Sequence, residues 1–266
     1  MKGFIFVILC AIAVVKGRSF SAQDEAVSVP WLVHLRLARF SGNGRLDSCV
    51  GTIYNNRYVL TAASCLTEFT QGSSTDTRYF WIRYDAQNVF RPGFVTETSK
   101  VKIHPDYNPR TGENNIGLVD LDREIQFTDK IQPLAVASSD VALPESGKVC
   151  GYGEKDGNPG EDLQCVDARV YKYDGLIAAF SDGKATKYDI GAALVADNKV
   201  HGILIREADE IFAGTFLPTS QYIKWLEEAT SPSDPKADDG SFDDAEEILV
   251  VEPVNIGSPD LFVGDF

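Results

Sequence analysis

The chain has 266 residues, of which 44% are hydrophobic and 11% aromatic, and a formal net charge of −14. This length and composition are sufficient for a sizeable hydrophobic core and argue against global disorder. The acidic charge argues against a nucleic-acid partner, because phosphate groups repel an acidic surface.

The amino-terminal residues predict a secretory signal peptide over residues 1–17. Lys2 is followed by an apolar run over residues 4–15, which is too short to span a bilayer. Removal of this segment, and of Cys10 with it, leaves Cys49, Cys65, Cys150 and Cys165. An even number of cysteines in a secreted chain indicates two disulfides. We therefore expect an extracellular protein.

The body of the chain predicts many short strands. Gly, Asn, Asp and Pro separate apolar runs, which are WLVHLRL (31–37), YVLTAA (58–63), RYFWIRY (78–84), IGLVDL (116–121), IQPLAVA (131–137), AALVADNKVHGILI (192–205) and AGTFL (213–217). Short strands with frequent turns are typical of an all-β sandwich or barrel. Residues 219–230 predict a helix, with Ser220 as its cap and Ile223, Trp225 and Leu226 as its apolar stripe.

The composition changes abruptly at Ser231. Residues 231–266 contain ten carboxylates and one lysine, and proline and glycine interrupt them repeatedly. This pattern predicts an acidic, largely disordered tail.

Five segments, in order along the chain, resemble the trypsin/chymotrypsin-like serine proteases, most closely the arthropod members. CVGTIYNNRYVLTAASCL (49–66) is similar to the segment around the family's catalytic histidine, and HPDYNPRTGENNIGLVDL (104–121) to that around its aspartate. CGYG with LQCVDARV resembles the strands that open the second barrel. KYDIGAALVADNKVHGIL (187–204) resembles the nucleophile loop, and GTFLPTSQYIKWL (214–226) the last strand and helix.

The resemblance implies two six-stranded antiparallel Greek-key β-barrels and a C-terminal helix. These form one domain over residues 18–230, with barrels at roughly 18–135 and 136–230. It also implies a Cys49–Cys65 disulfide that closes the histidine loop. A Cys150–Cys165 bridge is expected across two strands that pair antiparallel in the family.

The resemblance also implies that catalysis is lost. Ser64 stands at the histidine position, Asn115 at the aspartate position and Ile190 at the serine position, so base, carboxylate and nucleophile are all replaced. Tyr188 stands at the glycine that supplies the first oxyanion donor. Lys184 stands at the base of the primary specificity pocket. No enzyme activity is expected.

The pocket and activation regions differ from the family as well. Cysteines expected near Thr186 and within residues 207–214 are missing, and residues 205–208 (IREA) replace the family's S-W-G. In the family a liberated terminal ammonium pairs with the aspartate before the nucleophile, here Asp189. The amine of Ser19 is the candidate partner. His34, His104 and His201 map to strands and a turn outside the cleft, so we expect structural roles and neither a metal nor a cofactor.

The tail offers a candidate binding segment. DDGSFDDAEEIL is similar to the acidic tail of hirudin, which docks on a basic exosite of thrombin; the matching residues are Phe242, Asp243, Asp244, Glu246, Glu247, Ile248 and Leu249. Carboxylates would steer the encounter while the apolar side chains are buried. Two alternatives stay open: a solvating extension, and strands in ILVVEPVNI and LFVGDF that pair with an exposed sheet edge.

The sequence therefore predicts a secreted, non-catalytic serine protease homologue. It would bind a protease, zymogen or cascade cofactor with a basic surface, and no membrane. Clotting, complement and melanisation or immune cascades are compatible settings, and a salivary inhibitor of host haemostasis is the most specific version. The alternatives are a peptidase with an atypical catalytic arrangement and a structural or storage protein without a specific partner.

Overall fold

The computed structural model describes residues 28–38, 46–70, 73–76 and 79–231. The predicted signal peptide (1–17) and the candidate binding segment of the tail lie outside the described residues. The chain divides into two units at the Thr230–Ser231 junction, and every element named below belongs to the first.

The elements of the first half are mostly short strands. They are β1 (Leu32–Ala38), β2 (Leu46–Ile53), β3 (Tyr58–Thr61), α1 (Ala63–Leu66), β4 (Thr67–Thr70), β5 (Ser73–Asp76), β6 (Tyr79–Tyr84), β7 (Phe94–Thr98), β8 (Val101–Ile103) and β9 (Gly117–Asp120).

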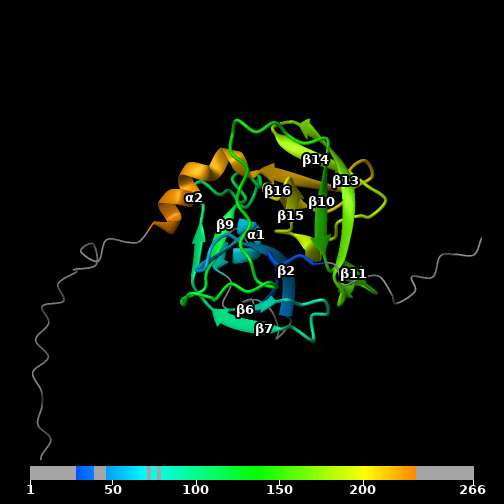
Figure 1. Cartoon of the computed structure of the whole chain (residues 1–266). Coiled ribbons are helices and arrows are strands. Elements are labelled where there is room, and N and C mark those ends of the chain that lie inside the picture. Colours follow the sequence, from blue (N-terminus) through cyan, green and yellow to red (C-terminus); the bar gives the residue numbers. More distant parts are fainter. Residues whose placement is uncertain (1–27, 39–45, 71–72, 77–78, 232–266) are drawn as a thin grey trace, which may run out of the picture. The chain divides into compact units, whose positions relative to one another are not determined.

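The second half contains further strands, two 3-10 turns and a C-terminal helix, coloured green to orange in Figure 1. The elements are β10 (Ser146–Gly151), β11 (Glu154–Lys155), β12 (Asn158–Pro159), β13 (Gln164–Tyr173), β14 (Leu176–Phe180), η1 (Lys187–Asp189), β15 (Ala193–Ala196), β16 (Lys199–Arg206), β17 (Gly214–Pro218), η2 (Thr219–Tyr222) and α2 (Ile223–Thr230).

The strands form two antiparallel barrel-like sheets. The second sheet is a closed barrel in the order β10-β13-β14-β17-β16-β15, and the first has the order β7-β6-β1-β2-β3-β9-β8. The end strands β7 and β8 are separated only by Ser99 and Lys100. One bent strand therefore pairs with β6 along its start and with β9 along its end. The predicted all-β architecture of two barrel-like halves is confirmed.

The alternation of side chains along β1 and β6 explains why these segments form strands at the core. Phe80, Ile82 and Tyr84 are fully buried and alternate with more exposed neighbours. Leu35 pairs with Ile82 in the ladder between the two strands. Successive side chains on a strand point to opposite faces, so this period of two places one apolar row inside.

Residues 131–137 do not form the predicted strand. They make only isolated bridges, Thr128 with Ile131 and Val136 with Val200. Pro133 has no N–H to donate to a ladder. The segment is apolar because it covers the core as the linker between the halves, and Leu134 and Ala137 are buried there.

The predicted C-terminal helix is confirmed only over its second part. Residues 219–222 form the 3-10 turn η2, and α2 starts at Ile223. Ser220 lies inside η2 and is not a cap, because Pro218 is the N-cap residue of η2. Leu226 is fully buried and Trp225 packs against the same core, so the predicted apolar stripe faces inward.

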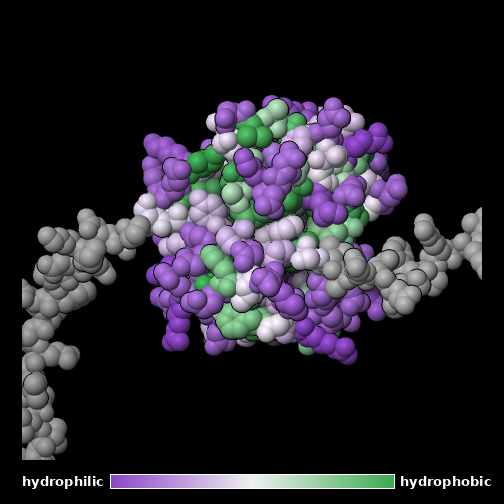
Figure 2. Space-filling model, viewed as in Figure 1, coloured by the Kyte–Doolittle hydropathy of each residue, from purple (hydrophilic) through white to green (hydrophobic). Residues whose placement is uncertain are grey.

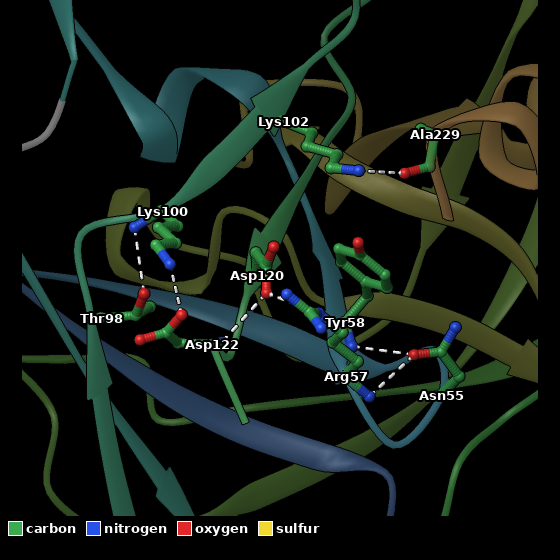
Figure 3. A network of polar contacts seen from close by, with 9 residues as sticks. All are labelled: Asn55, Arg57, Tyr58, Thr98, Lys100, Lys102, Asp120, Asp122 and Ala229. Carbon is green, nitrogen blue, oxygen red and sulfur yellow. Dashed lines mark hydrogen bonds and ion pairs between the residues drawn. The ribbon is translucent and has the colours of Figure 1, made fainter. Parts of the chain in front are cut away.

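A polar network fixes the end of α2 against the first sheet, as Figure 3 shows. The Lys102 ammonium of β8 donates to the carbonyl oxygen of Ala229, and it lies 5.0 Å from the ring centroid of Tyr58. Nearby, Asp120 accepts hydrogen bonds from Arg57 Nε at 3.1 Å and from the Asp122 N–H at 3.0 Å.

Within the described ranges, no helix has the length and apolar character needed to cross a membrane.

Candidate functional site

The structure brings Ser64 and Asn115 together. The Ser64 N–H donates to Asn115 Oδ1 at 2.8 Å, and Asn115 Nδ2 donates to Ser64 Oγ at 3.2 Å. Asn115 is only 4% exposed. The side-chain oxygen and nitrogen of Asn115 therefore both bond to Ser64. Neither a hydroxyl nor an amide accepts a proton near neutral pH, so the pair has no general base.

Ile190 lies next to this pair. Its carbonyl oxygen accepts the Val50 N–H at 2.9 Å and lies 3.6 Å from the sulfur of Cys65, which follows Ser64 in α1. That sulfur is in a disulfide, so the second approach is a contact and not a hydrogen bond. The Ile190 side chain packs against both hydrophobic clusters of the molecule. An isoleucine side chain offers no nucleophilic atom.

The backbone after Ile190 has room only for glycine. Gly191 has a φ of 89°, and a Cβ there would overlap Thr61 Oγ1 and the Val50 carbonyl oxygen. Its N–H donates to the Leu204 carbonyl oxygen at 2.8 Å. This close approach fixes the Ile190 segment between β2 and β16.

Tyr188 is turned into the protein. Its side chain is buried, and the hydroxyl donates to the Gly157 carbonyl oxygen at 3.0 Å. Its N–H donates to Thr186 Oγ1 at 3.3 Å, within the cap of η1. The N–H expected to serve as an oxyanion donor therefore has an internal acceptor.

Asp189 is buried and fully hydrogen-bonded. Oδ1 accepts the N–H groups of Tyr152 at 2.9 Å and Gly153 at 2.8 Å. Oδ2 accepts the N–H of Thr186 at 2.9 Å and its hydroxyl at 2.8 Å. Sequence reasoning missed the role of Thr186, although a threonine three residues before an acidic residue is the signature of a capping box.

The two segments expected to wall the specificity pocket are bonded to each other. The Ala208 N–H donates to the Ala185 carbonyl oxygen at 2.8 Å, and the Ala185 N–H donates to the Ala213 carbonyl oxygen at 2.9 Å. Lys184 is exposed. It lines a cavity of about 130 Å³ that also contacts Asp189. These backbone bonds join the regions in which the family's pocket cysteines are missing.

The histidines lie on β1, after β8 and on β16. His34 is 2% exposed, and burial, followed by the charges of Arg83 and Arg36, lowers its pKa to about 3. His104 contacts the rings of Tyr222 and Trp225. His201 is buried. Within the described part of the chain, no cluster of His, Cys, Asp and Glu side chains is suited to a metal ion.

Both expected disulfides are present. Cys49 of β2 is bonded to Cys65 of α1, with a Cα–Cα distance of 6.2 Å. Cys150 and Cys165 are bonded across a directly paired position of β10 and β13, with a Cα–Cα distance of 4.1 Å. The first bridge holds the Ser64 segment against β2, and the second lies beside the cavity at Asp189.

Comparison with known proteins agrees with this architecture. A family model described as Trypsin matches residues 18–226. Trypsin beta of Drosophila erecta is 28% identical over 196 residues, which are 66% of this chain and 73% of that protein. The clotting factor G beta subunit of Tachypleus tridentatus is 26% identical over 248 residues, 76% of each chain.

Solved structures share the fold. The crystal structure of a scabies mite inactivated protease paralogue, S-D1, superposes with a TM-score of 0.62 at 21% identity. The superposition covers 75% of this chain and 91% of that one.

Proposed function

This chain belongs to the trypsin family, and on that premise we propose that it is a secreted, non-catalytic homologue that regulates a proteolytic cascade by binding. A trypsin-like domain that lacks catalytic activity binds a protease, zymogen or cofactor without cleaving it. The cascade is one of clotting, complement, melanisation or immunity. Inhibition of host haemostasis by a salivary protein is the most specific form.

The chemistry of Ser64, Asn115 and Ile190 supports a loss of catalysis most directly. The first two side chains hydrogen-bond each other, and the third packs into the core. Acyl transfer in this family needs a base, a carboxylate that orients it and a nucleophile. No side chain of the three supplies any of these functions.

A neighbouring feature adds support. The Tyr188 N–H has an internal acceptor. An oxyanion donor must be free to point at the substrate. The scabies mite protein is itself described as an inactivated protease paralogue, so the fold occurs in a protein of that description.

The test is active-site labelling of the full chain with a fluorophosphonate, with and without prior treatment by trypsin. We expect no label in the folded protein and no hydrolysis of mixed peptide substrates, because no activated nucleophile is present. Active trypsin serves as the positive control. Stoichiometric labelling within residues 18–230 would replace this proposal with that of an atypical peptidase.

For the partner, we expect a protein with a basic surface that receives the acidic tail. Phe242 and Ile248 would bury apolar area, and the carboxylates at 243, 244, 246 and 247 would steer the encounter. A full-length variant with the ten tail carboxylates changed to amides tests this part. The tail remains in place in that variant, so only its charge differs.

Surface plasmon resonance against thrombin, or against partners captured from plasma or haemolymph, supplies the measurement. We expect the neutralised variant to associate at least about tenfold more slowly, and the wild type to lose affinity between about 0.05 M and about 0.5 M salt. Equal association rates for the two proteins would exclude the tail as the docking element. Absence of any specific partner would favour the structural or storage alternative.

A further inference from the structure

The outer side of the second barrel carries a group of aromatic and aliphatic side chains. We call this group the aromatic face; it consists of Tyr171 and Tyr173 of β13, Phe180 of β14, and Ile211 and Phe212 of the loop before β17. Strands β13 and β14 pair directly and lie side by side in Figure 1. Val170, between the two tyrosines, is buried in the core of the barrel. Because side chains alternate along a strand, the two tyrosines point outward.

The four rings of the aromatic face form a continuous row of contacts. The ring centroids of Tyr171 and Phe180 lie 5.4 Å apart, with an interplanar angle of 86°. Phe212 continues the row, with its centroid 5.3 Å from Phe180 at 84° and 4.9 Å from Tyr173 at 58°. Inclined ring pairs of this kind attract one another, so they fix the shape of the face.

The aromatic face is exposed to solvent on an ordered scaffold. Tyr171, Tyr173 and Phe180 are 53%, 56% and 39% exposed, and Ile211 is 69% exposed. The loop that carries Ile211 is held by the Asp209 carboxylate, which accepts two backbone N–H groups of the loop at 2.7 Å each. A surface that is already formed loses little conformational freedom on binding. Contiguous exposed apolar patches mark interaction sites.

The exposed area matches one side of a protein–protein interface. With about 200 Å² for each large side chain, the exposed parts of Tyr171, Tyr173, Phe180 and Ile211 amount to about 430 Å². A standard interface buries about 800 Å² on each partner, and about 56–65% of that area is apolar. The aromatic face therefore supplies nearly the whole apolar part of one such surface.

Two other classes of ligand fit the aromatic face less well. A sugar chain stacks on rings that share one plane, whereas the rings in contact here are inclined by at least 58°. An anionic membrane surface repels carboxylates, and Asp209 and Glu210 directly precede Ile211. The face therefore favours a protein partner.

The charges beside the aromatic face suit a second copy of this chain. Arg169 of β13 lies directly opposite Phe180 in the ladder, on one side of the rings. On the other side, where β17 pairs with β14, the loop segment 206–210 contains three carboxylates and one cation. Arg169, Glu207 and Glu210 have no ion-pair partner among the described residues. A two-fold axis through the rings brings Arg169 of each copy toward the carboxylates of the other.

We propose that two copies of this chain associate through their aromatic faces in a two-fold symmetric dimer. Ile211 and the rings lie at its centre, and Arg169 of each copy pairs with Glu207 or Glu210 of the other. The dimer is separate from the cascade role proposed above and does not depend on it. Each copy has a net charge of −14, but charges more than about 8 Å apart are largely screened at about 0.15 M salt.

The first test is sedimentation velocity of the full chain at about 0.15 M salt, from about 1 µM to about 300 µM. We expect the average mass to rise from that of a monomer toward twice that value, with a Kd below about 100 µM. Ile211→Asp should weaken association at least about tenfold, because it places a carboxylate at the centre of the interface. A monomeric mass over the whole range would overturn the proposal and leave the face to a different protein.

Phe90→Asp is the matched control. Phe90 is 70% exposed, as Ile211 is 69% exposed, and it lies outside the aromatic face. The same charge is thus added at an equally exposed apolar residue, so the Kd should stay at the wild-type value. An unchanged Kd in Ile211→Asp, or an equal loss in Phe90→Asp, would contradict a specific interface.

A charge exchange tests the two-fold arrangement and does not depend on Ile211→Asp folding. Arg169→Glu alone, and Glu207→Lys with Glu210→Lys, should each weaken self-association, because like charges then meet across the axis. In a mixture of these two variants both contacts again join opposite charges. The mixed dimer should therefore be at least about tenfold tighter than either variant's own dimer. No preference for the mixed dimer would overturn the proposed pairing.

Discussion

The carboxylate of Asp189 accepts four hydrogen bonds, two on each oxygen. A carboxylate has about four lone-pair positions, so no acceptor remains for a terminal ammonium group. In the family this aspartate is satisfied by the liberated amino terminus. Here the hydroxyl and N–H of Thr186 occupy one oxygen by themselves. The loop around η1 is therefore ordered by local donors.

Replacement of Thr186 tests this arrangement. Thr186→Val removes the hydroxyl donor and keeps the N–H, so unfolding should become easier by about 1.5–3 kcal/mol in denaturant titrations. The matched control is Thr111→Val, which removes an exposed hydroxyl bond to Glu113 and should cost below about 1 kcal/mol. Acetylation of the mature amino terminus should leave stability unchanged; a loss of stability on acetylation would show that an amine does reach Asp189.

His34 makes a second residue-level prediction, which concerns pH. The unfolded chain binds a proton at this residue below about pH 6.5, but the folded chain does so only near pH 3. Stability from this group is therefore complete above pH 6.5 and is lost as the pH falls toward 3. The loss should reach about 5 kcal/mol.

The measurement is urea unfolding at a series of pH values. His34→Phe should flatten the pH dependence between about 6.5 and 3, because the titrating ring is gone. His104→Phe, a change at a more exposed ring, should flatten it less. Identical slopes in the wild type and His34→Phe would show that His34 does not stay neutral in the fold.

At the scale of elements, α2 depends on its contact with β8. The Lys102 ammonium donates to the Ala229 carbonyl oxygen in the last turn, where a cation also interacts favourably with the helix dipole (Figure 3). Because α2 has only eight residues, it is too short to be stable without such contacts. The bond to β8 and the burial of Leu226 together hold it in place.

Lys102→Met tests this contact. It keeps the apolar stem and removes the charge, so amide exchange in the last turn of α2 should accelerate and stability should fall by about 0.5–1.5 kcal/mol. Lys224→Met is the control, because Lys224 is exposed and its Nζ lies 3.7 Å from a carboxylate oxygen of Glu228. That change should cost less than about 0.5 kcal/mol. Equal exchange rates in the two variants would rule out a specific role for Lys102.

At the scale of the whole molecule, polar and apolar residues are intermixed on the face that Figure 2 shows. Ile190 packs against both hydrophobic clusters, and Tyr188 is fixed by hydrogen bonds on its hydroxyl and its N–H. A change at Ile190 therefore affects both clusters. The interior is close-packed, so the surroundings adjust only partly.

Restoration of the family's side chains is consequently not expected to restore activity. The triple variant Ser64→His, Asn115→Asp and Ile190→Ser should hydrolyse peptides at background rate, because the Tyr188 N–H still donates to Thr186 Oγ1 and is not free to stabilise an oxyanion. Its melting temperature should also fall, since Ile190→Ser removes packed apolar volume. Hydrolysis within about a hundredfold of trypsin would show that the triad side chains alone limit catalysis.

Much of the fold could be predicted from local pattern. The apolar run at residues 78–84 predicted a strand, which is confirmed, and the resemblance of the segment that holds Cys49 and Cys65 implied their disulfide. The strand predicted at residues 131–137 and the helix cap predicted at Ser220 are wrong, because an apolar run and a small polar residue each fit several local structures. The apolar content of residues 131–137 does not show whether a neighbouring strand will pair with them.

The sequence by itself determined the family, several of the segments that become strands, and the absence of a base, a carboxylate and a nucleophile at three positions. These depend on the identity and spacing of side chains. Only the tertiary structure decided that Thr186 saturates Asp189 and that Ser64 and Asn115 bond each other. These hydrogen bonds join residues that are distant in the chain or depend on the local path of the backbone. A hydrogen bond requires its donor and acceptor atoms to lie about 3 Å apart, and the order of residues in the sequence does not contain such distances.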